Sequence, residues 1–319
     1  MRARPPPCAD ADTGIRMRVF GAAATRERLP FAALTAALAA AVARLAAGAI
    51  AAPERLVLPL AGGARYLVMP AADAQLAVTK LITVHPGNAA RGLPAIRGSV
   101  IVADAASGEP LMVLDGPAVT ARRTAALTLL GLRTLRPGPL GRAVLVGTGA
   151  QAREHALALH ETFGALLDVV GRDLGRAAAL CAGLAALGID ARPPLDRDAA
   201  TAAVFERADA IVTLTASLTP VLPEALPAAA LIVAVGAWTP RMAEVPPAVV
   251  QARQVGVDTL AGARHEAGDL LQAGVDWSRV RPLADCLGHA APAGPVLFKT
   301  VGHAAWDLAA ARVALGLEA

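Results

Sequence analysis

Apolar runs alternate with helical segments through the second half of the chain. Each run has four or five residues and is rich in Val, Leu, Ile and Ala, as expected for a strand buried on both faces. This alternation predicts an α/β fold with a Rossmann-type, doubly wound parallel sheet. The candidate strands cover residues 143–146, 167–170, 188–191, 210–214, 231–235 and 254–257.

The first half of the chain begins with a helix and continues as strands. Residues 31–52 are mostly alanine, and Arg44 interrupts them, which indicates an amphipathic helix and not a membrane span. The residues that follow alternate between apolar and polar, turn at Gly62-Gly63, and predict a mostly antiparallel sheet. Its candidate strands lie within residues 55–69, 75–84, 98–103 and 111–115.

Two further helices connect these halves. Residues 120–135 are helical in pattern; Thr120 can cap this helix, and Pro137-Gly138-Pro139 ends it. A last helix near residues 302–315 is long enough to return to the first half of the chain. Residues 1–16 contain no apolar stretch and are interpreted as a loose extension, not a signal peptide.

Composition and charge narrow the function. The chain is 55% hydrophobic but only 3% aromatic, so its core consists of Ala, Leu and Val. A net charge of +4 without a Lys/Arg run argues against nucleic-acid binding. Cys8, Cys181 and Cys286 are far apart and form no C-x-x-C motif, which indicates neither a metal site nor a disulfide framework and fits a reducing, cytoplasmic compartment.

Residues 147–152 read Gly-Thr-Gly-Ala-Gln-Ala and follow the first strand of the parallel sheet. Gly147 allows a tight turn, Gly149 allows a pyrophosphate to approach the backbone, and Ala152 allows close packing of helix against strand. The first N–H groups of the following helix favour an anion there. We predict a dinucleotide site that includes Thr148, Ala150 and Gln151.

The end of the second strand selects the dinucleotide. An acidic residue usually accepts a hydrogen bond from the ribose 2′-OH at this point. Here Arg172 stands at the strand end and Arg176 one helical turn later, and guanidinium groups bind a 2′-phosphate well. This favours NADPH, although Asp173 can serve NADH instead.

Three cations interrupt apolar segments of the first half. Lys80 ends the run Leu76-Ala-Val-Thr79, Arg55 opens the hairpin, and Arg123 lies within the helix at residues 120–135. A buried lone cation is costly unless it meets an anion. If the three converge, they form a carboxylate pocket. Each of them can equally be a surface charge, and the sequence does not decide this.

A series of short motifs resembles the ornithine cyclodeaminase/mu-crystallin family. The motifs run in order over about residues 55–310, nearly the whole chain, and are specific as a set. They comprise Lys80 with Pro86 and Asn88, residues 92–94, Asp104, residues 108–110, 120–126, 147–152, 236–240, 266–269 and 298–302, and Asp307.

The resemblance implies a homodimer in which substrate binds between two domains. Arg55, Lys80 and Arg123 would surround the substrate carboxylate, with Lys80 near the reacting carbon and nitrogen. Thr215, Val235 and Gly236 would join the glycine turn in binding the cofactor. The predicted domains are residues 17–124 with 302–319 for substrate binding and dimerisation, and residues 125–301 for NADP binding.

Two positions depart from the cyclodeaminases of this family. Those enzymes carry acidic residues where this chain has Trp238 and Leu67. Neither side chain can accept a proton from an ammonium group, so the pocket suits a neutral ring better than ornithine. A shifted loop would leave an alternative in which Glu244 supplies the missing acid.

We therefore predict an NADPH-dependent reductase of cyclic ketimine carboxylates, forming L-proline, L-pipecolate or both. Trp238 would contact the substrate, and Lys80 is the candidate proton donor. His85, His303 and Thr83 are weaker relay candidates, and Glu266 and Asp269 are expected to shape the cofactor domain. The alternatives are an ornithine cyclodeaminase, an alanine-dehydrogenase-like enzyme, or a mu-crystallin-like NADP-linked binding protein.

Overall fold

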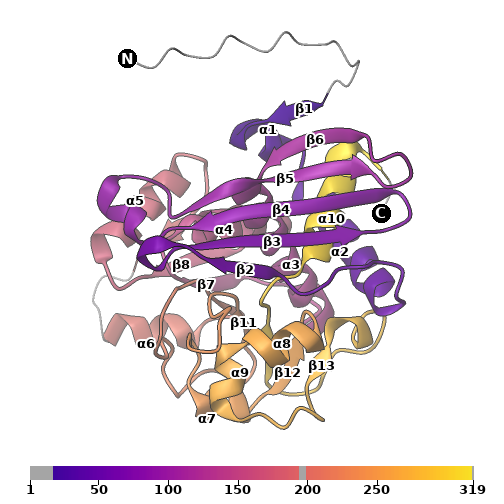
Figure 1. Ribbon diagram of the computed structural model, residues 1–319. Coiled ribbons are helices and arrows are strands. Elements are labelled where there is room, and N and C mark those ends of the chain that lie inside the picture. The colour runs from indigo at the N-terminus through magenta and orange to yellow at the C-terminus, as the bar shows by residue number, and fades with distance from the viewer. Residues whose placement is uncertain (1–16, 194–198, 318–319) are drawn as a thin grey trace.

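The strands of this protein form two sheets (Figure 1). The computed structural model describes residues 17–193 and 199–317. The first sheet has the order β1-β6-β5-β4-β3-β2, and only the β1–β6 pair in it is parallel. Its strands are β1 (Arg18–Phe20), β2 (Leu56–Pro59), β3 (Arg65–Ala72), β4 (Leu76–Val84), β5 (Ile96–Asp104) and β6 (Pro110–Asp115).

The second sheet is the predicted doubly wound parallel sheet. Its order is β13-β12-β14-β11-β10-β7-β8-β9, and all its strand pairs are parallel. The strands are β7 (Arg142–Val146), β8 (Leu166–Val170), β9 (Ala191–Arg192), β10 (Ala210–Thr213), β11 (Leu231–Ala234), β12 (Gln254–Val257), β13 (Arg281–Pro282) and β14 (Val296–Lys299).

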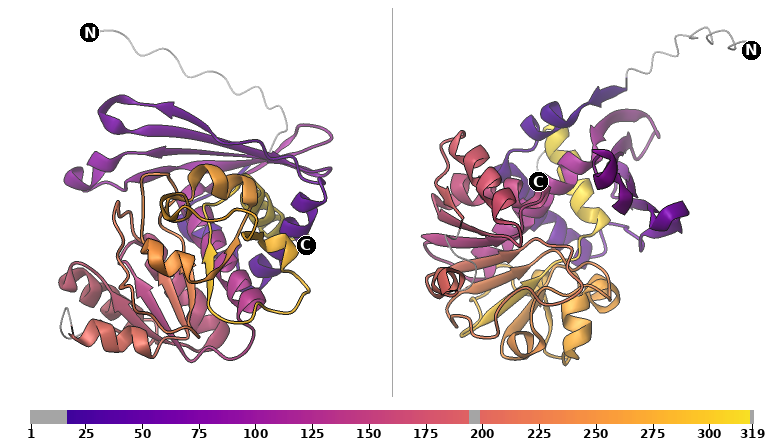
Figure 2. Two further views of the ribbon diagram at one scale, coloured as in Figure 1. Left: turned by 90° about the horizontal axis from the view of Figure 1, so that it is seen from below. Right: turned by 90° about the vertical axis from the view of Figure 1, so that its left-hand side faces the viewer.

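The helices cover both sheets and join them. In Figure 2, the yellow α10 lies between the first sheet and the rest of the molecule, and it packs on β3, β4 and α2. The helix α3 contacts β5 in the first sheet and β11 and β14 in the second, so it bridges the two. The helices are α1 (Ala22–Glu27), α2 (Phe31–Ala46), α3 (Gly116–Leu135), α4 (Ala150–Phe163), α5 (Leu174–Ala185), α6 (Ala199–Glu206), α7 (Pro247–Gln251), α8 (Leu260–Glu266), α9 (Gly268–Ala273) and α10 (Ala304–Leu315).

The structure confirms the predicted classes of element and corrects several details. The helix cap at Thr120 is wrong: α3 begins four residues earlier, and Asp115 caps it by accepting a hydrogen bond from Ala118 N at 2.8 Å. A capping carboxylate followed by proline is the stronger start signal. The predicted strand at residues 188–191 is also displaced, since β9 begins only at Ala191.

Two strands of the parallel sheet and the short elements before α2 escaped prediction. The central strand β14 contains only three apolar residues before Lys299, which reads as a strand boundary although it is buried. The short strands β1 and β13 and the short helix α1 carry too few residues for a periodic signal. Within residues 17–193 and 199–317, none of the helices has the length and apolarity needed to cross a membrane.

Candidate active site

The glycine turn has the geometry that a dinucleotide needs. Gly147 adopts φ +132°, and a Cβ on it would lie 2.7 Å from Leu214 O, so only glycine fits between β7 and β10. A Cβ on Gly149 would meet nothing within 4 Å, so open space lies in front of this backbone. Gly149 precedes α4 without a side-chain cap, and the first N–H groups of α4 remain for an anion.

The turn after β8 lies against this glycine turn. A Cβ on Gly171 would lie 2.7 Å from Thr148 Cγ2, so the two turns touch. Arg172 follows directly and is exposed. Asp173 caps α5, where its Oδ1 accepts a hydrogen bond from Arg176 N at 3.1 Å. Arg172 thus follows the residue that touches the glycine turn, and Arg176 lies in the first turn of α5.

Glu244 joins the turns after β10 and β11. Its Oε1 accepts hydrogen bonds from Thr215 N and Oγ1 at 2.6 and 2.8 Å, and its Oε2 accepts from Gly236 N at 2.6 Å. The predicted cofactor residues Thr215 and Gly236 are therefore held together. Val235 follows β11 directly and precedes Gly236, and its N–H donates a hydrogen bond to Thr213 O at 3.1 Å.

Lys80 and Arg123 meet at one carboxylate. Lys80 Nζ lies 2.8 Å from Asp307 Oδ2, and Arg123 Nε lies 3.4 Å from Asp307 Oδ1. The exposed fractions of Lys80, Arg123 and Asp307 are 1%, 5% and 0%, so all three are buried. One carboxylate opposes two cations, which leaves an excess of positive charge for an anionic ligand.

Arg55 completes this cluster from the start of β2. Its Nη2 donates to Gly302 O at 2.9 Å and forms an ion pair with Glu266 Oε2 at 2.9 Å. A Cβ on Gly302 would lie 3.1 Å from both Nη1 and Nη2 of Arg123, so Gly302 lies between the two arginines. Arg123 Nε is buried and has no hydrogen-bond partner among the described residues.

Burial and charge act together on Lys80. Burial lowers the pKa of Lys80 to about 8, Asp307 opposes this change, and Arg123 and Arg55 add to it by repulsion. The three predicted cations therefore converge, although their roles in catalysis stay a prediction. Lys80 lies in the middle of β4, which matches the predicted strand at residues 75–84.

Two further polar residues, Asp258 after β12 and His303 after β14, shape the loop that follows β14. Asp258 Oδ2 accepts hydrogen bonds from Thr300 Oγ1 and Gly302 N at 2.7 and 2.9 Å and so fixes the backbone that Arg55 contacts. His303 caps α10 by accepting a hydrogen bond from Ala305 N at 3.3 Å. Burial lowers the pKa of His303, Asp258 opposes this, and Arg55 adds to the lowering.

The remaining predicted residues lie farther from the cations. Leu67 is buried and diagonal to Lys80 on the inner face of the first sheet, because Leu67 pairs with Ile82 and Met69 with Lys80. Thr83 lies on the opposite face, where its Oγ1 donates to Arg97 O, so a relay through Thr83 to Lys80 is wrong.

The contacts of Trp238 and His85 lie outside the cluster of cations around Asp307. Trp238 is half-buried and packs against the apolar core around β11 and β14. His85 follows β4, and its N–H donates to Ala95 O at 2.7 Å. Substrate contact by Trp238 stays a prediction.

Sequence reasoning gave no role to two site acids. Asp307 was noted only as part of a family motif, yet it pairs with both Lys80 and Arg123. Asp258 was not noted at all. The signal for Asp307 is a lone acid in the first turn of a mostly apolar helix. A buried acid needs a cation as its partner. The sequence also contains cations within apolar segments, such as Lys80, that need an acid as theirs.

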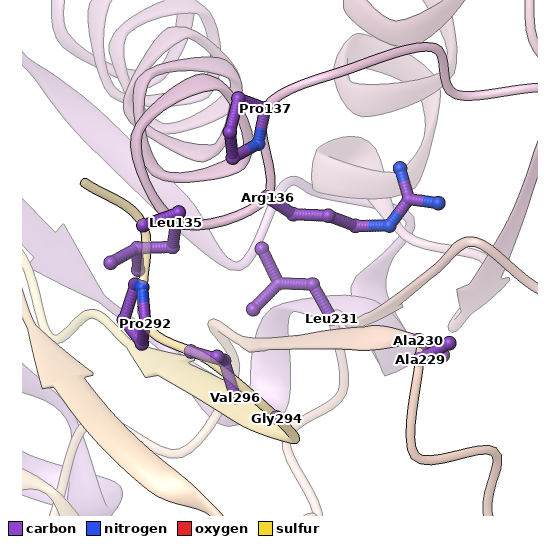
Figure 3. Close-up of a pocket in the computed structure, with 10 residues that line it drawn as sticks. Leu135, Arg136, Pro137, Ala229, Ala230, Leu231, Pro292, Gly294 and Val296 are labelled. Atoms are coloured by element: carbon purple, nitrogen blue, oxygen red, sulfur yellow. The ribbon is translucent and has the colours of Figure 1, made fainter.

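The cavity in Figure 3 lies at the amino ends of the parallel strands, where β11 and β14 begin. Its volume is about 210 Å³, and its lining includes Leu135, Leu231 and Val296. Arg136 points along its rim and pairs with Asp209 Oδ1 at 2.7 Å. None of the residues predicted to bind cofactor or substrate lines this cavity. Ligands of such sheets bind at the carboxyl ends of strands, so the candidate site is the one described above.

The parallel sheet and its glycine turn place the protein in the class of Rossmann-type α/β proteins. The sequence profile of the ornithine cyclodeaminase/mu-crystallin family matches residues 17–315. The chain therefore belongs to this family, and the resemblance drawn from its motifs is confirmed.

Two curated relatives match over almost their whole length. Delta(1)-pyrroline-2-carboxylate reductase 2 of Burkholderia ambifaria is 51% identical over 301 residues, which is 94% of this chain and 95% of the relative. Delta(1)-pyrroline-2-carboxylate/Delta(1)-piperideine-2-carboxylate reductase of Azospirillum brasilense is 50% identical over 298 residues, with 93% and 94% covered.

A solved structure shares the fold. Thermococcus litoralis Delta(1)-pyrroline-2-carboxylate reductase, in complex with NADH and L-proline, superposes with a TM-score of 0.85 at 22% identity. The match covers 94% of this chain and 97% of that one. At this identity the likeness concerns the fold, and it confirms the predicted α/β class.

Proposed function

We propose that this protein reduces cyclic ketimine carboxylates with NADPH. The substrates are Δ1-pyrroline-2-carboxylate, which gives L-proline, and Δ1-piperideine-2-carboxylate, which gives L-pipecolate. The observation that carries the proposal is the convergence of Arg55, Lys80 and Arg123 beside the carboxyl ends of the dinucleotide-type sheet. Relatives about half identical to this chain bear the names of such reductases.

The cation cluster suits the substrate carboxylate. The terminal nitrogens of Arg123 face Gly302, where a Cβ would lie 3.1 Å from both, and a carboxylate accepts two parallel hydrogen bonds from a guanidinium. Arg55 uses Nη2 for Gly302 and Glu266, so its other nitrogens can support the same anion. The two arginines would thus orient the ring before reaction.

Lys80 would supply the proton. When bound, NADPH would supply a hydride to ring C2 and become NADP+, and the electron pair of the C=N bond would move to nitrogen. The nitrogen then needs one proton, and the Lys80 ammonium holds one in a buried position. Asp307 favours the charged form of Lys80, so the proton is present before substrate binds.

The turn after β8 supports NADPH over NADH. The exposed Arg172 stands next to the glycine turn, and Arg176 follows on α5. Asp173 already serves as the cap of α5 through Oδ1. A 2′-phosphate would therefore meet two guanidinium groups at this turn.

The apolar surroundings of Lys80 support a ring imine over ornithine. Leu67 is 2% exposed beside Lys80, and Glu244 is 0% exposed with both oxygens bound to the turns after β10 and β11. A shifted acid at Glu244 that could receive a side-chain ammonium therefore gains no support. Removing the charged side chain of ornithine from water and placing it against apolar residues such as Leu67 would be costly.

The outer face of the first sheet supports a homodimer. It contains a hollow of about 360 Å³ lined by Tyr66, Leu81, Ile101 and Val113 among others. Apolar residues such as Leu58 in β2 and Ile101 in β5 are exposed around it. An exposed apolar patch of this kind marks an interaction surface.

The free, buried thiols of Cys181 and Cys286 support a reducing, cytoplasmic location.

A spectrophotometric screen tests the function. Loss of NADPH and of NADH is followed with each ring imine, and ammonia and proline are measured after incubation with ornithine and NAD. We expect turnover with at least one imine, faster with NADPH, and no proline from ornithine. Sustained proline formation from ornithine without net NADH production would contradict the reductase and favour a cyclodeaminase.

A further inference from the structure

A second buried charge cluster lies below the turns after β10 and β11. It consists of Glu244, Asp269 and Lys299, with exposed fractions of 0%, 1% and 0%. Lys299 Nζ lies 3.0 Å from Asp269 Oδ2, and Asp269 Oδ1 accepts hydrogen bonds from Glu244 N and Val245 N at 2.6 and 3.0 Å. The cluster thus connects β14 to the segment that carries Glu244.

Five donors converge on the Glu244 carboxylate. Besides Thr215 and Gly236, it accepts hydrogen bonds from Thr213 Oγ1 at 2.8 Å and from Ala237 N at 3.2 Å. Burial raises the pKa of Glu244, but Lys299 and the N–H of Thr215 oppose this by favouring the charged form. Two carboxylate oxygens can accept all five hydrogen bonds, whereas an amide would turn an NH₂ group toward some of the donors.

The turns after β10 and β11 also pack closely against each other. A Cβ on Gly236 would lie 2.0 Å from Thr215 O and 2.5 Å from Glu244 Oε1, so the two turns and the carboxylate are in direct contact. The segment from Gly236 to Glu244 closes on its own start and carries Trp238 between its ends. Gln272 Nε2 donates to Pro240 O at 2.9 Å and ties this segment to α9.

We infer that Glu244 is a positioning residue for the nicotinamide half of the dinucleotide. In doubly wound sheets, the strands on one side of the glycine turn bind the adenine half and those on the other side bind the second nucleotide. The glycine turn and Arg172 belong to β7 and β8, while Thr215 and Gly236 belong to β10 and β11. Glu244 therefore acts on one half of the site alone. This inference rests on the proposed dinucleotide binding, but not on the identity of the imine.

The test compares two ligands on two variants. Glu244→Gln keeps the size of the side chain but removes the all-acceptor carboxylate. Asp209→Asn is the matched control. Asp209 Oδ2 also accepts hydrogen bonds from two backbone N–H groups, those of Gly141 and Arg142, at 2.8 and 3.0 Å. These groups lie at the amino ends of the strands of the same sheet, away from the candidate site. Binding of NADPH and of 2′,5′-ADP, which carries the adenine half only, is measured by quenching of tryptophan fluorescence and by calorimetry, without imino acid.

We expect Glu244→Gln to weaken NADPH binding about tenfold or more, which corresponds to at least about 1.4 kcal/mol. The affinity for 2′,5′-ADP should change less than about twofold, and Asp209→Asn should leave both ligands unaffected even where its melting temperature falls. A Glu244→Gln protein that binds NADPH like the unmodified protein, or that loses both ligands equally, would overturn the inference.

A second variant covers the case in which Glu244→Gln does not fold. Glu244→Asp keeps the charge beside Lys299 but shortens the reach of the carboxylate by one methylene. The same selective loss of NADPH over 2′,5′-ADP is expected, with a smaller amplitude. If the unmodified protein binds NADPH but reduces neither ring imine, the proposed substrate fails while the role of Glu244 is still decided by these affinities.

Discussion

The two charge clusters of this protein differ in their balance of cations and carboxylates. In the cluster of Arg55, Lys80, Arg123 and Asp307, cations outnumber the carboxylate at their centre. In the cluster of Glu244, Asp269 and Lys299, every donor that faces Glu244 is bound. Unused buried donors do not separate the clusters, because Lys299 Nζ is also buried without a hydrogen bond among the described residues. An excess of cations suits an anionic ligand, whereas the second cluster has two carboxylates for one cation and holds the backbone turns around Glu244.

Removing the ammonium should break the first cluster most severely. Lys80→Ala takes away the proposed proton source, and we expect kcat to fall about 100-fold or more, as for loss of a general acid. The affinity for NADPH should stay nearly unchanged, because Lys80 serves the substrate. Stopped-flow or steady-state kinetics with either ring imine measure this. A variant that retains more than about a tenth of kcat, a barrier change under roughly 1.4 kcal/mol, would remove Lys80 from the mechanism.

Removing one guanidinium should affect binding more than chemistry. Arg123→Met keeps the apolar length of the side chain but loses a charge-assisted hydrogen bond worth about 1.5–3 kcal/mol, so KM for the imino acid should rise about 10- to 100-fold. Arg122→Met is the matched control, since Arg122 is the neighbouring arginine and donates to Leu29 O instead. Equal KM values for Arg123→Met and the unmodified protein would show that the carboxylate binds elsewhere.

A charge outside both clusters should act on the cofactor alone. Arg172→Asp should weaken NADPH binding more than NADH binding, by about 1–3 kcal/mol, because a charge-assisted pair with the 2′-phosphate is lost. The measurement is KM for both cofactors in both proteins. Equal KM values for NADPH and NADH in the unmodified protein would contradict the NADPH preference from the start.

The smallest expected effect is on the pH dependence of kcat, which depends on Lys80 in the first cluster. If protonated Lys80 donates the proton, kcat should be constant below its pKa and fall to half at about pH 8, because deprotonation then removes the donor. Asp307 raises the pKa of Lys80, so in Asp307→Asn the fall should begin at lower pH. A profile that is flat up to pH 10, or one that Asp307→Asn leaves in place, would assign the proton to another group.

Much of the fold could be predicted because local patterns carry it. The apolar runs at β7, β8, β10, β11 and β12 and the glycine turn each signal their structure within a few residues, since a buried strand needs continuous apolar side chains. The displaced strand β9 and the missed strand β14 show the limit of this signal. Lys299 ends the apolar pattern of β14, yet it is buried because Asp269, from a different segment of the chain, neutralises it.

The residue types of the candidate site were also evident from the sequence, and the family motifs added their order. Charged side chains within apolar segments marked Lys80 and Arg123, because a cation cannot be buried without an anion nearby. Which anion they meet was decided only by tertiary structure. Asp307 comes from α10, which follows the parallel sheet in the chain and packs back onto β4.

The roles of the acids likewise depended on contacts that no local pattern contains. Glu244 stood in the sequence as a possible substitute for a missing catalytic acid, but its carboxylate closes the turns after β10 and β11. The sequence by itself determined the fold class, the glycine turn and the set of cations, because these follow from periodicity and from the chemistry of single residues. The tertiary structure decided which charges meet, since ion pairs between residues far apart in the chain form only when separate elements pack together.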